Sequence, residues 1–288
     1  MRQAVGRAVR VNGRSVYVEE SGRGPDWVVF EAGGGLGRTC WDPVLPLLAD
    51  RARLVAYDRA GFGRSGRTAV QLGIDDMAAD LVAMVEAVVP GPFVLVAHSM
   101  GGLVARRAVE SLGPRLRGLL LLDPTPERAP VYDTFDRTAR KVGRAMGATQ
   151  ALVRSRTLAR MVSGNIRRVF PADTYATMLA EDIVPAGIAQ TRKEFKAVAA
   201  AIPQLRAEPP VLPTCPTVLL SASRPVKGRE QQHAALAEHQ RRWVQTLPEG
   251  RFEEVDSGHF IQAEQPGTVA NWGENLLDRA PGRRVRSA

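Results

Sequence analysis

Short apolar runs alternate with longer stretches of helical spacing along the chain up to Asp123. Four of these runs are apolar and partly β-branched, which is typical of strands buried inside a parallel sheet. They are residues 27–30, 54–57, 93–97 and 118–122. Helix-forming residues at helical spacing occupy 41–49, 74–88 and the stretch from 101 onward. This alternation predicts an α/β fold built from right-handed βαβ units around a parallel sheet.

Residues 7–20 have a different pattern, in which polar and apolar residues alternate around Asn12 and Gly13. An Asn-Gly pair between two alternating runs is typical of a β-hairpin with a tight turn. We therefore expect two antiparallel strands here, both at the edge of the sheet.

The strand–helix alternation stops after Asp123. The next stretches are all helical in spacing, are separated by Gly164, Pro171 and Pro185, and cover 131–148, 150–162, 172–181 and 187–201. A proline-rich linker at 208–213 leads back to alternating strands and helices at 217–220, 228–246, 252–255 and 264–279. The pattern predicts a core domain of residues 1–123 and 209–288, interrupted by an all-helical insertion at 124–208.

Composition narrows the classes of protein. The chain has 288 residues, of which 44% are hydrophobic and 24% charged, as expected of a globular protein with one large α/β domain. It has neither a signal-peptide pattern nor an apolar run that could span a bilayer, so we expect a cytoplasmic protein without stable membrane association. The two cysteines, Cys40 and Cys215, lack metal-ligand spacing and are expected to be free thiols.

The net charge of +9 raises the question of a nucleic-acid partner. The basic residues are mostly arginines spread along the chain, with a tail at Arg283, Arg284 and Arg286. Because no nucleic-acid-binding motif accompanies the charge, we expect no such partner. The sequence leaves the oligomeric state open.

The apolar run 93–97 passes into a helix within about three residues, with Ser99 in the turn. A turn this sharp requires small neighbours, which Ala97, Gly101 and Gly102 supply. Its central residue is forced into an exposed, strained conformation at a helix N-terminus, where developing negative charge is favoured. The pattern predicts that Ser99 is a nucleophile; the alternative is a serine that only caps the helix.

A serine hydroxyl needs a base to take its proton, and histidine is the natural base near neutral pH. The chain has four histidines. His259 directly follows the last predicted strand, at the sheet edge where Ser99 lies, and is the predicted base. His98 is next to Ser99, but side chains diverge around a tight turn, so it is expected to line the substrate pocket or to pack. His233 and His239 are six residues apart on a helix and are expected to face solvent.

Negative charge on the substrate oxygen must be stabilised by a pair of amide donors. One donor is the backbone N–H of Met100, the residue after the predicted nucleophile. The other is expected from the loop after the first buried strand, where Gly33, Gly34 and Gly35 let backbone approach a substrate. We predict Gly34 as the second donor, with Gly33 and Gly35 lining the substrate site; the alternative is a tight turn without catalytic function.

Together these motifs resemble those of the α/β-hydrolase-fold serine hydrolases, the esterase- and lipase-like enzymes. The resemblance extends over nearly the whole chain through the glycine triplet 33–35, residues 58–63, the serine turn, Leu122-Asp123-Pro124 and Ser257-Gly258-His259. It implies a mostly parallel, doubly wound sheet, a helical cap formed by the insertion 124–208, a small-molecule substrate, and neither metal nor organic cofactor. Asp58 is expected to fix its loop through backbone amides.

The resemblance also implies a triad acid. Many members of the superfamily carry it after the strand that corresponds to 217–220, but residues 221–225 contain no acid. Some relatives carry it one strand earlier, and that position is Asp123. We assign the acid to Asp123, with Glu230 and Asp256 as alternatives.

The predicted activity is hydrolysis of a small-molecule carboxylic ester or lactone through an acyl-enzyme. The serine argues against dehalogenases and epoxide hydrolases of this fold, which use an aspartate nucleophile. Aminopeptidase, thioesterase, carbon–carbon bond hydrolase and perhydrolase activities remain alternatives, as does a non-catalytic ligand-binding protein. Apolar residues of the insertion are expected either to line a substrate chamber or to form helical core; they are Phe135, Met146, Met161, Phe170, Met178 and Phe195.

Overall fold

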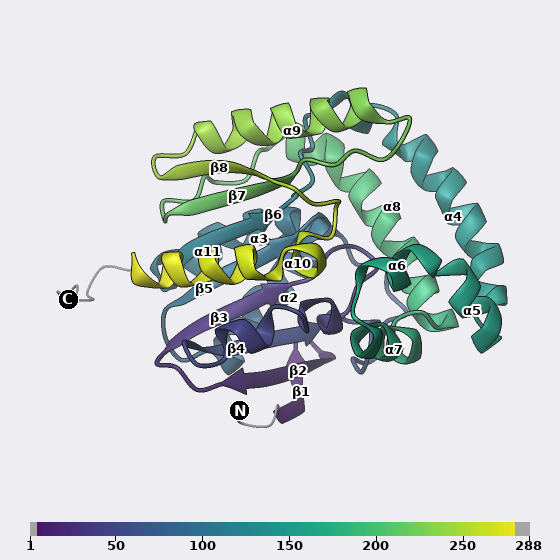
Figure 1. Ribbon diagram of the computed structural model, residues 1–288, viewed down its shortest axis with the longest axis horizontal. Helices are drawn as coiled ribbons and strands as arrows, with labels where there is room; N and C mark the ends of the chain where they lie inside the picture. Colours follow the sequence, from purple (N-terminus) through teal and green to yellow (C-terminus); the bar gives the residue numbers. More distant parts are fainter. Residues whose placement is uncertain (1–4, 280–288) are drawn as a thin grey trace.

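The computed structural model describes residues 5–279 and contains an eight-stranded sheet in the order β1-β2-β4-β3-β5-β6-β7-β8 (Figure 1). The strands are β1 (Val5–Val11), β2 (Arg14–Gly22), β3 (Asp26–Glu31), β4 (Ala52–Asp58), β5 (Phe93–His98), β6 (Leu116–Leu122), β7 (Thr217–Ala222) and β8 (Gly250–Val255). All pairs from β4 to β8 in this order are parallel. The predicted α/β fold with a mostly parallel sheet is confirmed.

The predicted hairpin is present, with Asn12 and Gly13 both at positive φ (47° and 78°) in the turn. Of these two strands only β1 lies at an edge of the sheet, because β2 pairs with β1 on one side and with β4 on the other. The expectation of two edge strands was therefore wrong for β2.

Helices cover both faces of the sheet, and the side chains of β5 alternate between the two layers. Phe93, Leu95 and Ala97 join the core beneath α2 (Ile74–Val88), α3 (Met100–Leu112) and α9 (Glu230–Gln245). Val94 and Val96 join the opposite core, which contains α1 (Leu45–Leu48), α10 (Ile261–Glu264) and α11 (Pro266–Asp278). Strands buried on both faces account for the continuous apolar runs in the sequence.

The helix expected at 41–49 is much shorter than predicted. The segment forms one turn of 3-10 helix, η1 (Arg38–Trp41), and then the single-turn helix α1. Pro43 and Pro46 lack the N–H groups that a continuous helix would use, which explains the interruption.

Between β6 and β7 lie five helices, which we call the helical segment. They are α4 (Phe135–Leu152), α5 (Arg156–Val162), α6 (Gly164–Val169), α7 (Ala172–Glu181) and α8 (Pro185–Ala207). They form a layer beyond the carboxyl ends of the parallel strands, with α4 and α8 side by side (Figure 1). Pro185 begins α8 rather than preceding it, and α8 continues past 201 to Ala207 with Pro203 inside it.

The division into a core domain of residues 1–123 and 209–288 and a separate cap at 124–208 stays a prediction. The basic tail at Arg283, Arg284 and Arg286 lies outside the described residues. Cys40 and Cys215 are free thiols. Within residues 5–279, no helix is both long enough and apolar enough to cross a membrane.

Candidate active site

Ser99 lies in the sharp turn between β5 and α3, with φ 54° and ψ −120°. This left-handed conformation is costly for a residue with a side chain and is typical of functional turns. A Cβ on Gly101 would lie 2.5 Å from the carbonyl oxygen of Ala32, so only glycine permits this close approach. The turn is fixed by the backbone N–H of Ser99, which donates to the oxygen of Leu122 on β6 (2.9 Å).

The structure brings Ser99, His259 and Asp123 together at the carboxyl edge of the sheet. The Nε2 atom of His259 lies 3.0 Å from Ser99 Oγ, and its Nδ1 atom lies 2.6 Å from Asp123 Oδ2. Asp123 follows β6 at φ 41°, and His259 lies in the loop after β8. An imidazole protonated at Nδ1 donates to Asp123 and leaves Nε2 to accept from the serine hydroxyl.

Asp123 has a second partner, Gln240 on α9, which the sequence analysis missed. The amide Nε2 of Gln240 donates to Asp123 Oδ1 (3.0 Å) and to the Pro124 carbonyl oxygen (2.8 Å). Its Oε1 accepts from Ser221 Oγ at 2.7 Å, which fixes the orientation of the amide. No sequence signal distinguished this residue from other polar residues of an amphipathic helix.

These contacts determine the charge of Asp123. Burial alone would raise the pKa of its carboxyl group, but the hydrogen bonds from His259 and Gln240 and the charge of His259 outweigh it. The pKa of Asp123 is therefore held below its ordinary value. An ionised carboxylate stabilises a positive charge that forms on the imidazole.

The two alternative acids lie away from the histidine. Glu230 is exposed at the start of α9, where its carboxylate accepts the backbone N–H of Gly228 (2.8 Å). The side chain of Asp256 is 86% exposed and pairs with Arg224. Among the predicted candidates, the structure brings only Asp123 to His259.

His98 is buried beneath His259, with 4.7 Å between the two ring centroids. Burial and the neighbouring His259 lower the pKa of His98 to about 3, so the ring is neutral. Its Nε2 donates to the carbonyl oxygen of His259 at 2.9 Å. A Cβ on Gly33 would lie 2.5 Å from His98 Nδ1, so glycine is needed for this contact too.

The glycine turn after β3 lies next to the serine turn. An added Cβ on Gly34 would touch the Met100 side chain, and both residues line the same cavity. Gly35 has φ 77°, and its backbone N–H donates to Glu194 Oε2 on α8 (2.8 Å). In residues 5–279 the N–H of Gly34 has no hydrogen-bond partner.

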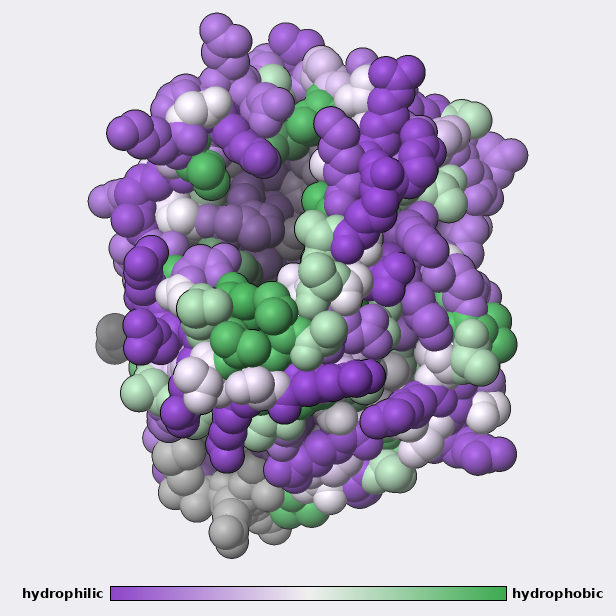
Figure 2. Space-filling model, turned by 90° about the vertical axis from the view of Figure 1, so that its right-hand side faces the viewer, coloured by the Kyte–Doolittle hydropathy of each residue, from purple (hydrophilic) through white to green (hydrophobic). Residues whose placement is uncertain are grey.

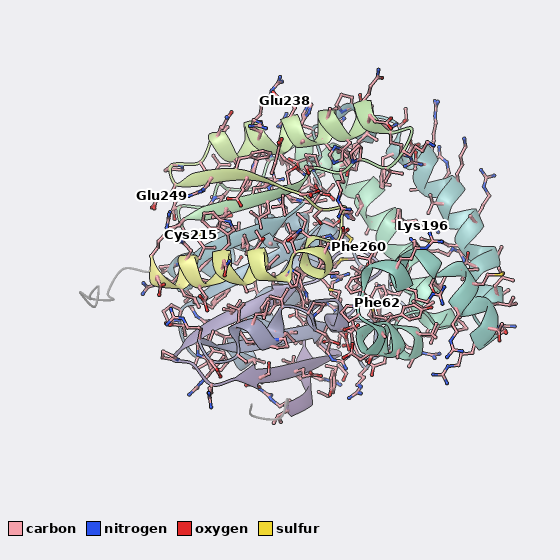
Figure 3. All side chains as sticks on the ribbon, viewed as in Figure 1. Phe62, Lys196, Cys215, Glu238, Glu249 and Phe260 are labelled. Carbon is pink, nitrogen blue, oxygen red and sulfur yellow. The ribbon has the colours of Figure 1, made fainter. Side chains whose placement is uncertain are left out.

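A cavity of about 560 Å³ lies above Ser99 and is walled mainly by the helical segment. The face formed by these helices is hollowed, with apolar side chains near the hollow (Figure 2). Phe260, which follows His259, lies where the sheet meets the helical segment and contacts the Phe170 ring (Figure 3). Of the apolar residues expected in a chamber, Phe135, Met146 and Phe195 line the cavity. The others do not: Phe170 and Met178 are buried in core, and Met161 is 68% exposed.

The cavity wall holds little free charge. None of its lining residues is a lysine or an arginine. The arginines of α5, α6 and the turn before α5 lie on the surface; they are Arg154, Arg156, Arg160, Arg167 and Arg168. The wall contains two carboxylates, and both have a side-chain partner. Asp123 accepts a hydrogen bond from His259, and Glu194 accepts one from Arg59.

Elsewhere, Asp58 accepts the backbone N–H groups of Arg38 (2.8 Å) and Arg64 (3.0 Å), which confirms its expected contacts with loop amides. His233 and His239 lie on α9, where both are partly buried and not fully exposed to solvent as expected; His239 Nδ1 donates to the carbonyl oxygen of Ala235 (2.8 Å). No group of three or more His, Cys, Asp or Glu side chains within the described part of the chain is arranged to hold a metal ion.

Parts of this chain are similar in sequence to known proteins. A pimeloyl-acyl-carrier protein methyl ester esterase of Aeromonas hydrophila is 34% identical over 113 residues, which cover 39% of this chain and 42% of that protein. A putative carbamate hydrolase of Azorhizobium caulinodans is 31% identical over 108 residues, covering 38% and 40%. The chain spans about two fifths of the length of the curated relatives it matches.

Similarity in three dimensions extends further than similarity in sequence. The crystal structure of a putative alpha/beta hydrolase from Nostoc superposes with a TM-score of 0.75, at 20% identity, over 96% of this chain and 99% of that one. The sequence model of the alpha/beta hydrolase family matches residues 28–272. Because this match covers most of the chain, the protein belongs to the alpha/beta hydrolase family.

Proposed function

We propose that the protein is a serine hydrolase that cleaves an uncharged carboxylic ester or lactone through an acyl-enzyme. One observation carries the proposal: a continuous hydrogen-bonded series from Asp123 through His259 to Ser99 at the floor of a cavity. This is the arrangement of nucleophile, base and orienting acid that acyl transfer requires.

In the proposed mechanism, Ser99 Oγ attacks the carbonyl carbon while its proton passes to His259 Nε2. Asp123 holds the imidazole by its Nδ1–H and stabilises the positive ring. The carbonyl oxygen, now negative, accepts hydrogen bonds from the backbone N–H groups of Gly34 and Met100. His259 then gives its proton to the leaving alcohol oxygen. Water, deprotonated by the same imidazole, releases the acid and restores Ser99.

The charge of the cavity supports an uncharged substrate. A substrate carboxylate would meet no lysine or arginine in the wall. A substrate ammonium, as an aminopeptidase requires, would have to compete with Arg59 for Glu194. Thioesters remain compatible, because they undergo the same acyl transfer, and so do carbon–carbon bonds next to a carbonyl group.

A fluorophosphonate probe and a set of esters test the proposal. Wild-type protein should be labelled covalently and should hydrolyse p-nitrophenyl esters, with a preference for uncharged acyl groups over dicarboxylic half-esters of equal length. Ser99→Ala should lose labelling and turnover. Labelling that persists in Ser99→Ala would contradict the proposal and indicate a different nucleophile. A wild type inert towards esters, lactones and thioesters would also contradict it and would favour a binding protein.

A further inference from the structure

Glu194 is a buried carboxylate outside the Ser99–His259–Asp123 series, and it reaches the glycine turn from the helical segment. It lies on α8 and is 1% exposed. Its Oε2 accepts the backbone N–H of Gly35 (2.8 Å) and Arg59 Nη2 (3.1 Å), while its Oε1 accepts Arg59 Nε (2.8 Å). A single carboxylate therefore connects α8, the arginine and the turn.

Arg59, from the loop after β4, holds the other side of the same turn. Its Nη2 donates to the carbonyl oxygen of Gly33 at 2.7 Å, and its Nη1 donates to that of Ala32 at 2.6 Å. Nη1 also donates to Glu31 Oε1 at 2.8 Å, and Glu31 is completely buried. The guanidinium is thus fixed between two carboxylates and cannot turn without losing both.

The Gly33 oxygen accepts this short bond from Arg59 and a longer one from the Leu36 N–H (3.3 Å), and its direction determines where the Gly34 amide points. The carbonyl of Gly33 and the N–H of Gly34 belong to one planar trans peptide unit, so they point in opposite directions. When Arg59 holds the Gly33 oxygen, the Gly34 N–H is directed away from Arg59. The Gly34 N–H has no hydrogen-bond partner within residues 5–279. Gly34 lies against Met100, whose backbone N–H is the other predicted donor.

We propose that Glu194 and Arg59 are positioning residues that set the oxyanion-binding geometry of Gly34, so that α8 must be docked for the site to be complete. The inference rests on the proposed hydrolase function. It makes the helical segment part of the catalytic geometry as well as the wall of the cavity. Among residues 5–279, the hydrogen bonds that join Ser99, His259 and Asp123 to one another involve no residue of α8.

Two variants of the intact chain, Glu194→Gln and Glu194→Ala, test the role of the carboxylate. A third, Arg59→Lys, tests the role of the guanidinium that pairs with it. Glutamine keeps an acceptor for Gly35 but loses the charge that orients Arg59, whereas alanine loses both. We expect kcat to fall about 10-fold for glutamine and about 100-fold for alanine or Arg59→Lys, with KM changed less than 3-fold, because a transition-state contact is lost. The double variant that combines Glu194→Ala with Arg59→Lys should have nearly the same kcat as either single variant, since the two residues act as one unit.

A thiono substrate separates this role from a general structural one. Sulfur accepts hydrogen bonds weakly, so a thionoester gains little from the two amides. A defect confined to the oxyanion site should slow p-nitrophenyl acetate by the full loss in kcat, about 10-fold for Glu194→Gln and about 100-fold for Glu194→Ala, and should slow its thiono analogue much less. Distortion of Ser99 or His259 should slow both substrates equally.

Glu181→Gln is the matched control. Glu181 also joins the helical segment to the sheet region, through Arg38 Nη1 (2.7 Å) and Arg64 Nε (2.9 Å), but it has no contact with the turn 33–35. Its kcat and its oxo-to-thiono rate ratio should equal those of the wild type, with thermal melting used to verify folding of every variant.

An unchanged rate ratio in folded Glu194 variants would overturn the inference and leave the hydrolase function standing. The same holds if Glu181→Gln changes the ratio as much as Glu194→Gln. A wild type without Ser99-dependent ester cleavage would overturn both the function and the inference.

Discussion

The site has two halves, the series Ser99–His259–Asp123 and the glycine turn 33–35, and they are held in different ways. Ser99 and Asp123 stand directly after the parallel strands β5 and β6, His259 lies in the loop after β8, and backbone bonds such as Ser99 N–H to Leu122 O fix their loops. The glycine turn also follows a strand, β3, but apart from the bond of the Leu36 N–H to the Gly33 oxygen (3.3 Å), its carbonyl and amide groups are held by side chains of Arg59 and Glu194. One half depends on the sheet, and the other depends on a helix more than 150 residues away in the chain, as the Gly35–Glu194 separation of 159 positions shows.

This difference has a consequence for movement of the helical segment. The contact between Ser99 and His259 involves no residue of the helical segment. A shift of α8 would carry Glu194 with it and release Gly35 and Arg59. Substrate that orders α8 would therefore complete the oxyanion site as it binds, which links binding to catalysis.

The largest expected effect lies in the half that depends on the sheet. Asp123→Asn keeps the shape of the side chain but allows its amide to face the imidazole, which favours the wrong tautomer of His259. We expect kcat to fall by about 10⁴-fold with little change in melting temperature. Steady-state kinetics on an ester checks this, with Glu230→Gln as the control that keeps full turnover. Loss of turnover in Glu230→Gln instead would contradict the role of Asp123.

The same division explains how much could be predicted from the sequence. Parallel strands place their carboxyl ends at one edge, so Ser99 and His259 could be assigned to one site from strand order. The acid was assigned to Asp123 only through the resemblance to α/β-hydrolases, with Glu230 and Asp256 as alternatives, because residues 221–225 contain no acid. The alternation of apolar runs predicted the sheet for the same reason.

Contacts that depend on tertiary packing could not be predicted. Glu194 is one acidic residue on a long helix, and nothing in the sequence says which way α8 turns or how near the glycine turn it lies. Gln240 was missed for the same reason. The split of 41–49 into two short helices depended on Pro43 and Pro46, which are visible in the sequence but were outweighed by its apolar spacing.

A second test adds a side chain to the glycine turn. In Gly33→Ala the new Cβ would lie 2.5 Å from His98 Nδ1 and 3.3 Å from Ser99 Cβ, so the turn must move away from the serine. Displacement of one oxyanion donor costs about 10²–10³-fold in kcat, and we expect a loss in this range. Gly164→Ala is the control, because a Cβ there meets nothing within 4 Å. A Gly33→Ala enzyme of normal rate would show that the turn has no catalytic function.

A smaller effect is expected from Gln240, which supports Asp123 from α9. Gln240→Leu removes the hydrogen bond to Asp123 Oδ1 and to the Pro124 oxygen but leaves the bond to His259. Hydrogen bonds to a charged group contribute about 1.5–3 kcal/mol, and part of this should appear as a roughly 10-fold lower kcat. The pH–rate profile should change with it, since Asp123 loses a donor that favours its ionised form. An unchanged profile would mean that Gln240 serves only packing.

The smallest effect on kcat is expected for a change that acts on stability, and this change contrasts Asp123 with a second buried carboxylate. Asp182, at the end of α7, accepts Gly37 N–H (3.3 Å) and Thr39 Oγ1–H (3.1 Å), so it ties the helical segment to the loop just beyond the glycine turn. Burial, and then the nearby charge of Asp58, raise the pKa of Asp182 to about 7. The folded protein therefore binds this proton at a pH where the unfolded chain, at its ordinary value of 3.8, has released it.

The sign of the pH dependence follows from this difference. Between about pH 4 and pH 7 the folded state holds more protons at Asp182 than the unfolded state, so its contribution to stability falls as pH rises through this window. Asp123, whose pKa is lowered, contributes in the opposite direction: its stabilisation is present above its unfolded value and is lost as pH falls. Asp182→Asn cannot ionise and mimics the protonated form. Thermal melting at pH 5 and pH 8 should show Asp182→Asn gaining stability relative to the wild type by about 2–3 kcal/mol, or roughly 4–12 °C, at the higher pH, with kcat unchanged. A difference in melting temperature between the two proteins that stays constant with pH would mean that Asp182 is ionised throughout. The hydrogen bonds that hold α7 to this loop would then be accepted by a charged carboxylate and not by a neutral carboxyl group.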